Sequence, residues 1–112
     1  MADGRDLIEE AFNIVKETSD GLLNFKAKYP AEAFAEFEGV VTSALKWLKL
    51  CRGKVWLRGL EGTTLAQGCL DAAKQLKAAL DDPHAAIEAA GDLSGQAEQL
   101  AKIIATKVQV LT

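Results

Sequence analysis

The sequence predicts an all-α protein folded as an antiparallel, up-down four-helix bundle. Apolar residues recur every three or four positions in four long stretches, which is the period of an amphipathic helix. Proline and glycine mark the boundaries between these stretches, and no alternating strand pattern competes with them. The connections are short, which favours antiparallel neighbours. With 112 residues, the chain is long enough for one core, so we expect a single domain over 1–112.

The first helix is expected over residues 5–28. Tyr29 and Pro30 end it, because a residue that precedes proline is disfavoured in the helical region. Gly21 lies inside the apolar stripe and either breaks the helix or is tolerated at a cost of about 1 kcal/mol relative to alanine. The stripe comprises Ile8, Phe12, Val15, Ser19, Leu22, Lys26 and Tyr29.

The second helix is expected over residues 31–52, with Pro30 suited to its first turn. Glycines at 53, 59 and 62 interrupt or end the helical pattern, so the stretch around 52–62 is either a short extra helix or an irregular loop. One face of the second helix carries Phe34, Phe37, Val41, Ala44, Leu45, Leu48 and Cys51.

The third helix is expected over residues 63–81, with Thr63 or Thr64 as its N-cap. Its stripe comprises Leu65, Cys69, Ala72, Leu76 and Ala79. The fourth helix is expected over residues 83–111, because an aspartate followed by proline is typical of a helix start. The stretch from Gly91 to Gly95 lies inside its stripe, so that helix either continues or divides there.

The most unusual segment is 46–58, KWLKLCRGKVWLR, which contains five basic residues, both tryptophans and no acid. The whole chain has 13 basic and 16 acidic residues, so the remainder is strongly acidic. Two interpretations remain open. The tryptophans belong to the core and the basic side chains answer acids elsewhere in the fold, or the segment contacts a partner.

A helical wheel of the second helix favours the partner. Leu50 points away from the core face beside Lys46 and Lys54. If the helix continues past residue 53, Leu57 joins Leu50 off the core. A second off-centre apolar set occurs in the fourth helix. The residues expected to contact a partner are Trp47, Leu50, Lys54, Trp56, Leu57, Arg58, Ile103 and Val110.

We therefore expect a non-catalytic protein-interaction or assembly module that self-associates. The alternative is a peripheral binder of anionic membrane or lipid through segment 46–58, with tryptophan at the headgroup level. A third possibility is a bundle that opens around an apolar ligand. Nucleic acid is disfavoured, because the isoelectric point near 5.1 opposes binding to phosphates.

An enzyme is not expected. His84 is the only histidine and lies at the start of the fourth helix, so no histidine-based metal site forms within one chain. No phosphate-binding loop or nucleophile motif occurs, and no cofactor is expected.

Cys51 and Cys69 fall on predicted core faces. We expect two free thiols in a reducing environment, and a disulfide between them is the alternative if the hairpin turns near residue 60. The N-terminus lacks the pattern of a secretory signal, so a cytoplasmic location is expected.

Overall fold

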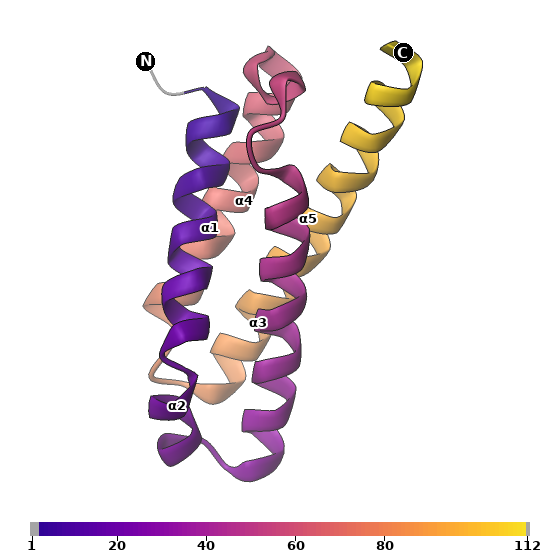
Figure 1. The fold of residues 1–112 in the computed structure, drawn as a ribbon. Helices are drawn as coiled ribbons and strands as arrows, with labels where there is room; N and C mark the ends of the chain where they lie inside the picture. Colours follow the sequence, from indigo (N-terminus) through magenta and orange to yellow (C-terminus); the bar gives the residue numbers. More distant parts are fainter. Residues whose placement is uncertain (1–2, 112) are drawn as a thin grey trace.

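The computed structural model describes the backbone of residues 3–111 and the side chains of residues 3–107. The regular elements of this part of the chain are all helices, which confirms the predicted all-α class. The elements, labelled in Figure 1, are α1 (Gly4–Asp20), α2 (Leu22–Lys28), α3 (Ala31–Cys51), the short 3-10 helix η1 (Val55–Arg58), α4 (Leu60–Ala78) and α5 (Pro83–Leu111).

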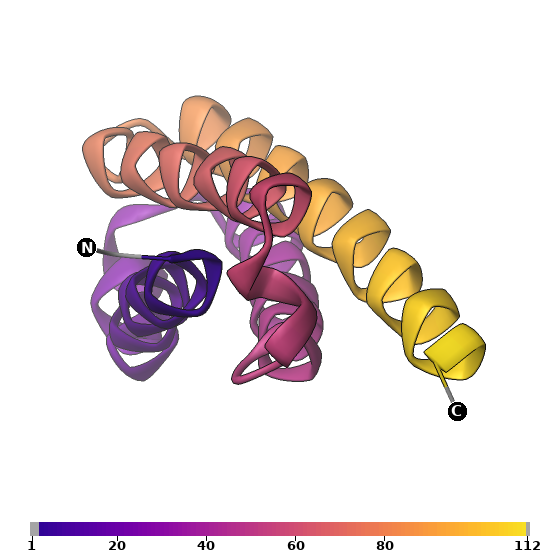
Figure 2. The same cartoon turned by 90° about the horizontal axis from the view of Figure 1, so that it is seen from above.

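Four long helices surround the core. α1 packs on α3 and α4, and α5 packs on the same two helices. Viewed from above, the order around the core is α1, α3, α5, α4 (Figure 2). α3 and α5 run in the same direction, as do α1 and α4 (Figure 1). The expectation that all neighbours are antiparallel therefore differs from the structure, because the connection after α3 crosses one end diagonally to reach α4.

α1 begins with a capping box between Asp3 and Asp6, in which the backbone N–H of Asp3 donates to the carboxylate of Asp6 at 3.2 Å. The carboxylate of Asp3 also accepts from the backbone N–H of Arg5 at 2.9 Å. The helix ends at Asp20, so the expected helix over 5–28 is divided at Gly21, one of the two anticipated outcomes. The bend that follows allows Phe25 on α2 to pack edge-on against a ring of α3. The packed aromatic cluster consists of Phe25, Tyr29 and Phe37, with ring centroids 5.2–5.5 Å apart.

The connection between α3 and α4 contains the short extra helix η1. α3 ends at Cys51, and Gly53 then adopts a φ of 70°, which favours glycine. α4 begins at Leu60, earlier than the expected start at Thr63. Neither Thr63 nor Thr64 is the cap, because both residues lie within α4 and its N-cap is Gly59. The hydroxyl of Thr63 donates to the carbonyl of Leu57 at 3.1 Å and accepts from the backbone N–H of Gly4, the first residue of α1, at 3.1 Å. The hydroxyl therefore ties η1 and α4 to the start of α1.

α4 and α5 contribute mainly small residues to the core. α4 ends at Ala78, earlier than the expected residue 81, and α5 begins at Pro83 as expected. α5 continues without a break through residues 91–95. The buried alanines of these two helices allow close packing, and they are Ala66, Ala72, Ala73, Ala86, Ala89, Ala90, Ala97 and Ala101.

Candidate functional site

The basic tryptophan-rich segment 46–58 divides into two parts. Its first part forms the last turns of α3, and its second part forms the connection and η1 at one end of the molecule. The division follows from the end of α3 at Cys51, which separates Trp47 from Trp56. The two tryptophans therefore occupy different surroundings.

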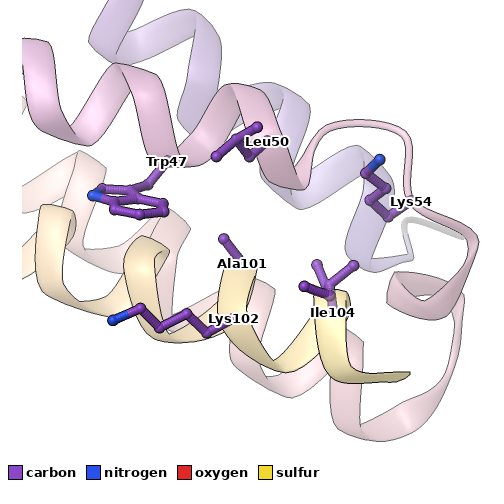
Figure 3. A pocket seen from close by; sticks show the side chains of 7 residues that line it. Trp47, Leu50, Lys54, Ala101, Lys102 and Ile104 are labelled. Carbon is purple, nitrogen blue, oxygen red and sulfur yellow. The ribbon is translucent and has the colours of Figure 1, made fainter. Parts of the chain in front are cut away.

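The first part forms one wall of a groove between α3 and α5, with a volume of about 440 Å³ (Figure 3). Trp47 is half-buried against the core, whereas Leu50 is 51% exposed. Ile104, on the facing helix, is almost fully buried and forms part of the apolar lining. This groove, called the α3–α5 groove below, is lined by Trp47, Leu50, Lys54, Ala101, Lys102, Ile104 and Ala105.

The helix that forms the second wall of the groove, α5, is longer than the helices beside it. α5 has 29 residues, whereas α3 has 21 and α4 has 19. The far end of α5 leans away from the other helices (Figures 1 and 2).

Both arginines of the segment form ion pairs with acidic residues near the start of the chain. The guanidinium of Arg52 donates two hydrogen bonds of 2.8 Å to the carboxylate of Glu9 and lies 4.1 Å from the centre of the Phe12 ring. This partner raises the pKa of Arg52. Arg58 lies 3.9 Å from the carboxylate of Asp3. The interpretation that basic side chains of this segment answer acids elsewhere therefore holds for both arginines.

The lysines near the groove are engaged differently. The ammonium of Lys46 lies 4.9 Å from the centre of the Trp47 ring, and Lys102 pairs with Glu98 at 2.9 Å. Among residues 3–107, Lys46, Lys49 and Lys54 form no ion pair. Of the two lysines that line the groove, Lys102 is paired with Glu98, so Lys54 gives the rim its positive charge.

The structure brings together three of the residues expected to contact a partner, Trp47, Leu50 and Lys54. Trp56 is half-buried on η1 and packs against the core instead. Ile103 lines a separate hollow of about 370 Å³ beside the groove. The side chain of Val110 lies outside the described residues.

The expectation that Leu57 lies off the core is wrong. Its side chain is 0% exposed. The wheel assumed that α3 continues past Gly53, but the helix ends before that glycine, and η1 turns Leu57 inward against α4 and α1.

The wall contributed by α5 was missing from the sequence-based prediction. Ile104 falls on the core stripe of its helix, and Ala101 and Lys102 have no distinctive pattern. The only available signal was length, because an apolar stripe that continues to the end of the longest helix exceeds what the shorter helices are able to cover.

Both cysteines are buried free thiols. The thiol of Cys51 donates to the carbonyl of Ala97 on α5 at 3.7 Å. Burial raises the pKa of Cys51 to about 12 and that of Cys69 to about 11, so both remain protonated at neutral pH. Protonated, inaccessible thiols are poor nucleophiles and poor metal ligands.

The described residues contain no group of three or more histidine, cysteine or acidic side chains placed to hold a metal ion. His84 is exposed on the first turn of α5, where its backbone N–H donates to the carboxylate of Asp82 at 3.0 Å. Among the described helices, none combines the length and the apolar composition needed to cross a bilayer.

Comparisons of the chain with protein-family models, with curated protein sequences and with solved structures found no significant match.

Proposed function

We propose that the chain is a non-catalytic interaction module that associates with a second copy of itself through the α3–α5 groove. The observation that carries the proposal is the groove itself, in which a half-buried tryptophan and an exposed leucine lie beside a buried isoleucine under a basic rim. Tryptophan at the centre of a desolvated patch is typical of the residues that dominate binding energy at protein interfaces. The proposed scaffold is a four-helix bundle of α1, α3, α4 and α5, with α2 and η1 closing its ends.

Leu50 is the exposed apolar residue of the groove that a partner would cover. It lines the α3–α5 groove and also a second hollow of about 510 Å³ on the outer side of α3. Complete burial of a leucine stabilises by about 1.5–3 kcal/mol, so covering the exposed half of Leu50 contributes on the order of 1 kcal/mol. The adjacent Trp47 ring adds further apolar area.

The charge of the molecule supports self-association. Lys54 on the rim forms no ion pair among residues 3–107 and favours an acidic partner, and the chain itself carries 16 acidic residues against 13 basic ones. A second copy therefore supplies the acids without any further component. The absence of catalysis is part of the same proposal, and the protonated state of both buried thiols supports it.

Leu50→Asp tests the proposal directly. A carboxylate in the groove loses the apolar contact and resists desolvation, so we expect the dissociation constant of the self-complex to rise at least tenfold. Sedimentation velocity at several concentrations measures this change. The matched control is Leu23→Asp, since Leu23 is 79% exposed on α2, far from the groove, and the same substitution there leaves association unchanged.

The competing occupant is an anionic membrane surface. Arg52 is already paired with Glu9 of α1 and Arg58 with Asp3, so only part of the basic segment is left to bind lipid headgroups. Co-sedimentation with vesicles containing phosphatidylserine separates the two occupants. Vesicle binding by a chain that stays monomeric, reduced by Leu50→Asp, would replace self-association with membrane binding.

A further inference from the structure

The face formed by α3 and α5 carries another hollow at the end opposite the groove, distinct from the one beside Leu50. The charge of this hollow is opposite to that of the groove. This hollow has a volume of about 430 Å³ and lies where α3 and α5 begin. Its charged lining is acidic apart from His84. The lining residues are Pro30, Glu32, Ala33, Glu36, Asp82, Pro83, His84 and Ile87, and this site is called the acidic hollow below.

The two sites are placed symmetrically about the middle of the face. The hydroxyls of Ser43 on α3 and Ser94 on α5 lie 2.8 Å apart and form a hydrogen bond between the two helices. With a rise of 1.5 Å per residue, positions seven residues from this pair lie about 10 Å from it along each helix. Seven residues before the serines, Glu36 and Ile87 line the acidic hollow, and seven residues after them, Leu50 and Ala101 line the groove.

The middle of the face is open to close approach. Gly39 on α3, and Gly91 and Gly95 on α5, have no atom within 4 Å of the position where a Cβ would lie. A glycine inside a helix costs about 1 kcal/mol relative to alanine. Packing within one copy does not account for these three glycines, because no neighbouring group occupies the space that they leave.

We infer that two copies associate face to face through α3 and α5, about a two-fold axis that passes near the Ser43–Ser94 hydrogen bond. This inference rests on the proposed self-association and specifies its geometry. In such an isologous interface each contact occurs twice, so the basic groove of each copy meets the acidic hollow of the other. Lys54 of one copy then faces Glu32 and Glu36 of its partner copy, and Lys102, which pairs with Glu98 of its own copy, lies beside it.

The face is small for a protein–protein interface. α3 has 21 residues and is therefore about 30 Å long, and two adjacent helices are about 20 Å wide. The face thus offers about 600 Å² per copy, or about 1,200 Å² in total, which is the lower limit for a specific interface. The expected dimer is reversible, with a dissociation constant on the order of micromolar.

Two complementary charge reversals test this geometry. The double variant Glu32→Lys with Glu36→Lys makes both ends of the face basic, and Lys54→Glu with Lys102→Glu makes both ends acidic. Each variant alone repels its own copies, so its dissociation constant rises at least tenfold above that of the unmodified chain. An equimolar mixture restores association, because in the mixed dimer both groove-to-hollow contacts again join opposite charges.

Sedimentation velocity of each variant and of the mixture gives the outcome, with circular dichroism to establish that each variant is folded. Restoration in the mixture supports the two-fold arrangement. If the unmodified chain dimerises but the mixture does not regain association, the arrangement is overturned while self-association stands. If the unmodified chain is a monomer up to about 1 mM, both proposals fail.

Gly91→Gln provides a second test that does not depend on charge. A Cβ at this position meets no neighbour within one copy, and glutamine favours the helix more than glycine does, so the free energy of unfolding of the monomer rises. The added side chain obstructs the approach of the second copy, so association weakens at least tenfold. A gain in stability with unchanged association would contradict the arrangement.

Discussion

Gly62 allows α4 to pass directly against η1. A Cβ at this position would lie 2.6 Å from the carbonyl oxygen of Trp56 and 2.7 Å from the Cα of Leu57, and both contacts involve backbone atoms that cannot rotate away. Gly4 is restricted in the same way by the carbonyl of Leu57. The absence of a side chain at these two positions therefore allows η1 to pack closely against α1 and α4, and this packing buries Leu57.

We predict opposite effects for two glycine substitutions. Gly62→Ala forces η1 to shift and lowers the free energy of unfolding by about 1–3 kcal/mol. Gly91→Ala meets no neighbour and raises it by up to about 1 kcal/mol, because alanine favours the helix. Urea denaturation monitored by circular dichroism measures both. A Gly62→Ala variant as stable as the unmodified chain would show that η1 is not held in this way.

The buried thiols make stability depend on alkaline pH. Burial raises the pKa of Cys51 to about 12 and that of Cys69 to about 11, from an ordinary value of 9.0. In the unfolded chain both thiols lose protons from about pH 9, so above this pH the unfolded state binds fewer protons than the folded state. The contribution of these thiols to the free energy of unfolding is therefore complete below pH 9 and decreases as the pH rises toward 11.

The expected decrease is about 1.4 kcal/mol per pH unit for each thiol at most. Urea denaturation at about pH 7.5, 9 and 10 measures it. Cys51→Ala is the informative comparison, because the variant is less stable at every pH but its stability falls less steeply above pH 9. Equal slopes for the variant and the unmodified chain would contradict the assignment.

At the level of elements, the break between α1 and α2 is held by packing. Gly21 has a φ of −96°, which other residues also adopt, and a Cβ there would make only ordinary contacts of 3.5 Å or more. The ring of Phe37 is fully buried and packs edge-on against those of Phe25 and Tyr29. The aromatic cluster therefore determines where α2 lies.

We predict that Gly21→Ala changes the free energy of unfolding by less than about 1 kcal/mol, whereas Phe37→Ala lowers it by about 3–5 kcal/mol. The first variant tests whether glycine itself is required at the break, and the second tests the packing. Urea denaturation of both variants gives the comparison. A larger loss for Gly21→Ala than for Phe37→Ala would assign the break to local backbone conformation.

The periodic stripes predicted the helices well, because burial of one face imposes the same spacing wherever a helix packs. Leu50 was correctly placed off the core, since its helix continues regularly through that residue. Leu57 was not, because the end of α3 depends on Gly53 and on the contacts of η1 with other helices. The α5 wall of the groove could not be predicted either, since helical periodicity does not show which helix lies beside α3.

At the scale of the whole molecule, charge is segregated along the face formed by α3 and α5. Acidic side chains line the hollow where these helices begin, and Lys54 and Lys102 line the groove near the end of α3. A molecule with opposite charges at the two ends of one face is complementary to its own inverted copy. Because such contacts are screened by salt, we expect the dimer to weaken as sodium chloride increases.

The most direct test of the proposed self-association is the mass of the unmodified chain in solution, measured by sedimentation equilibrium from about 1 μM to about 1 mM. We predict that the weight-average mass rises with concentration from 12.0 kDa toward twice that value and stops there, because a two-fold interface closes on itself. A constant mass of 12.0 kDa over the whole range would contradict self-association. A mass that continues to rise beyond the dimer would contradict a closed interface.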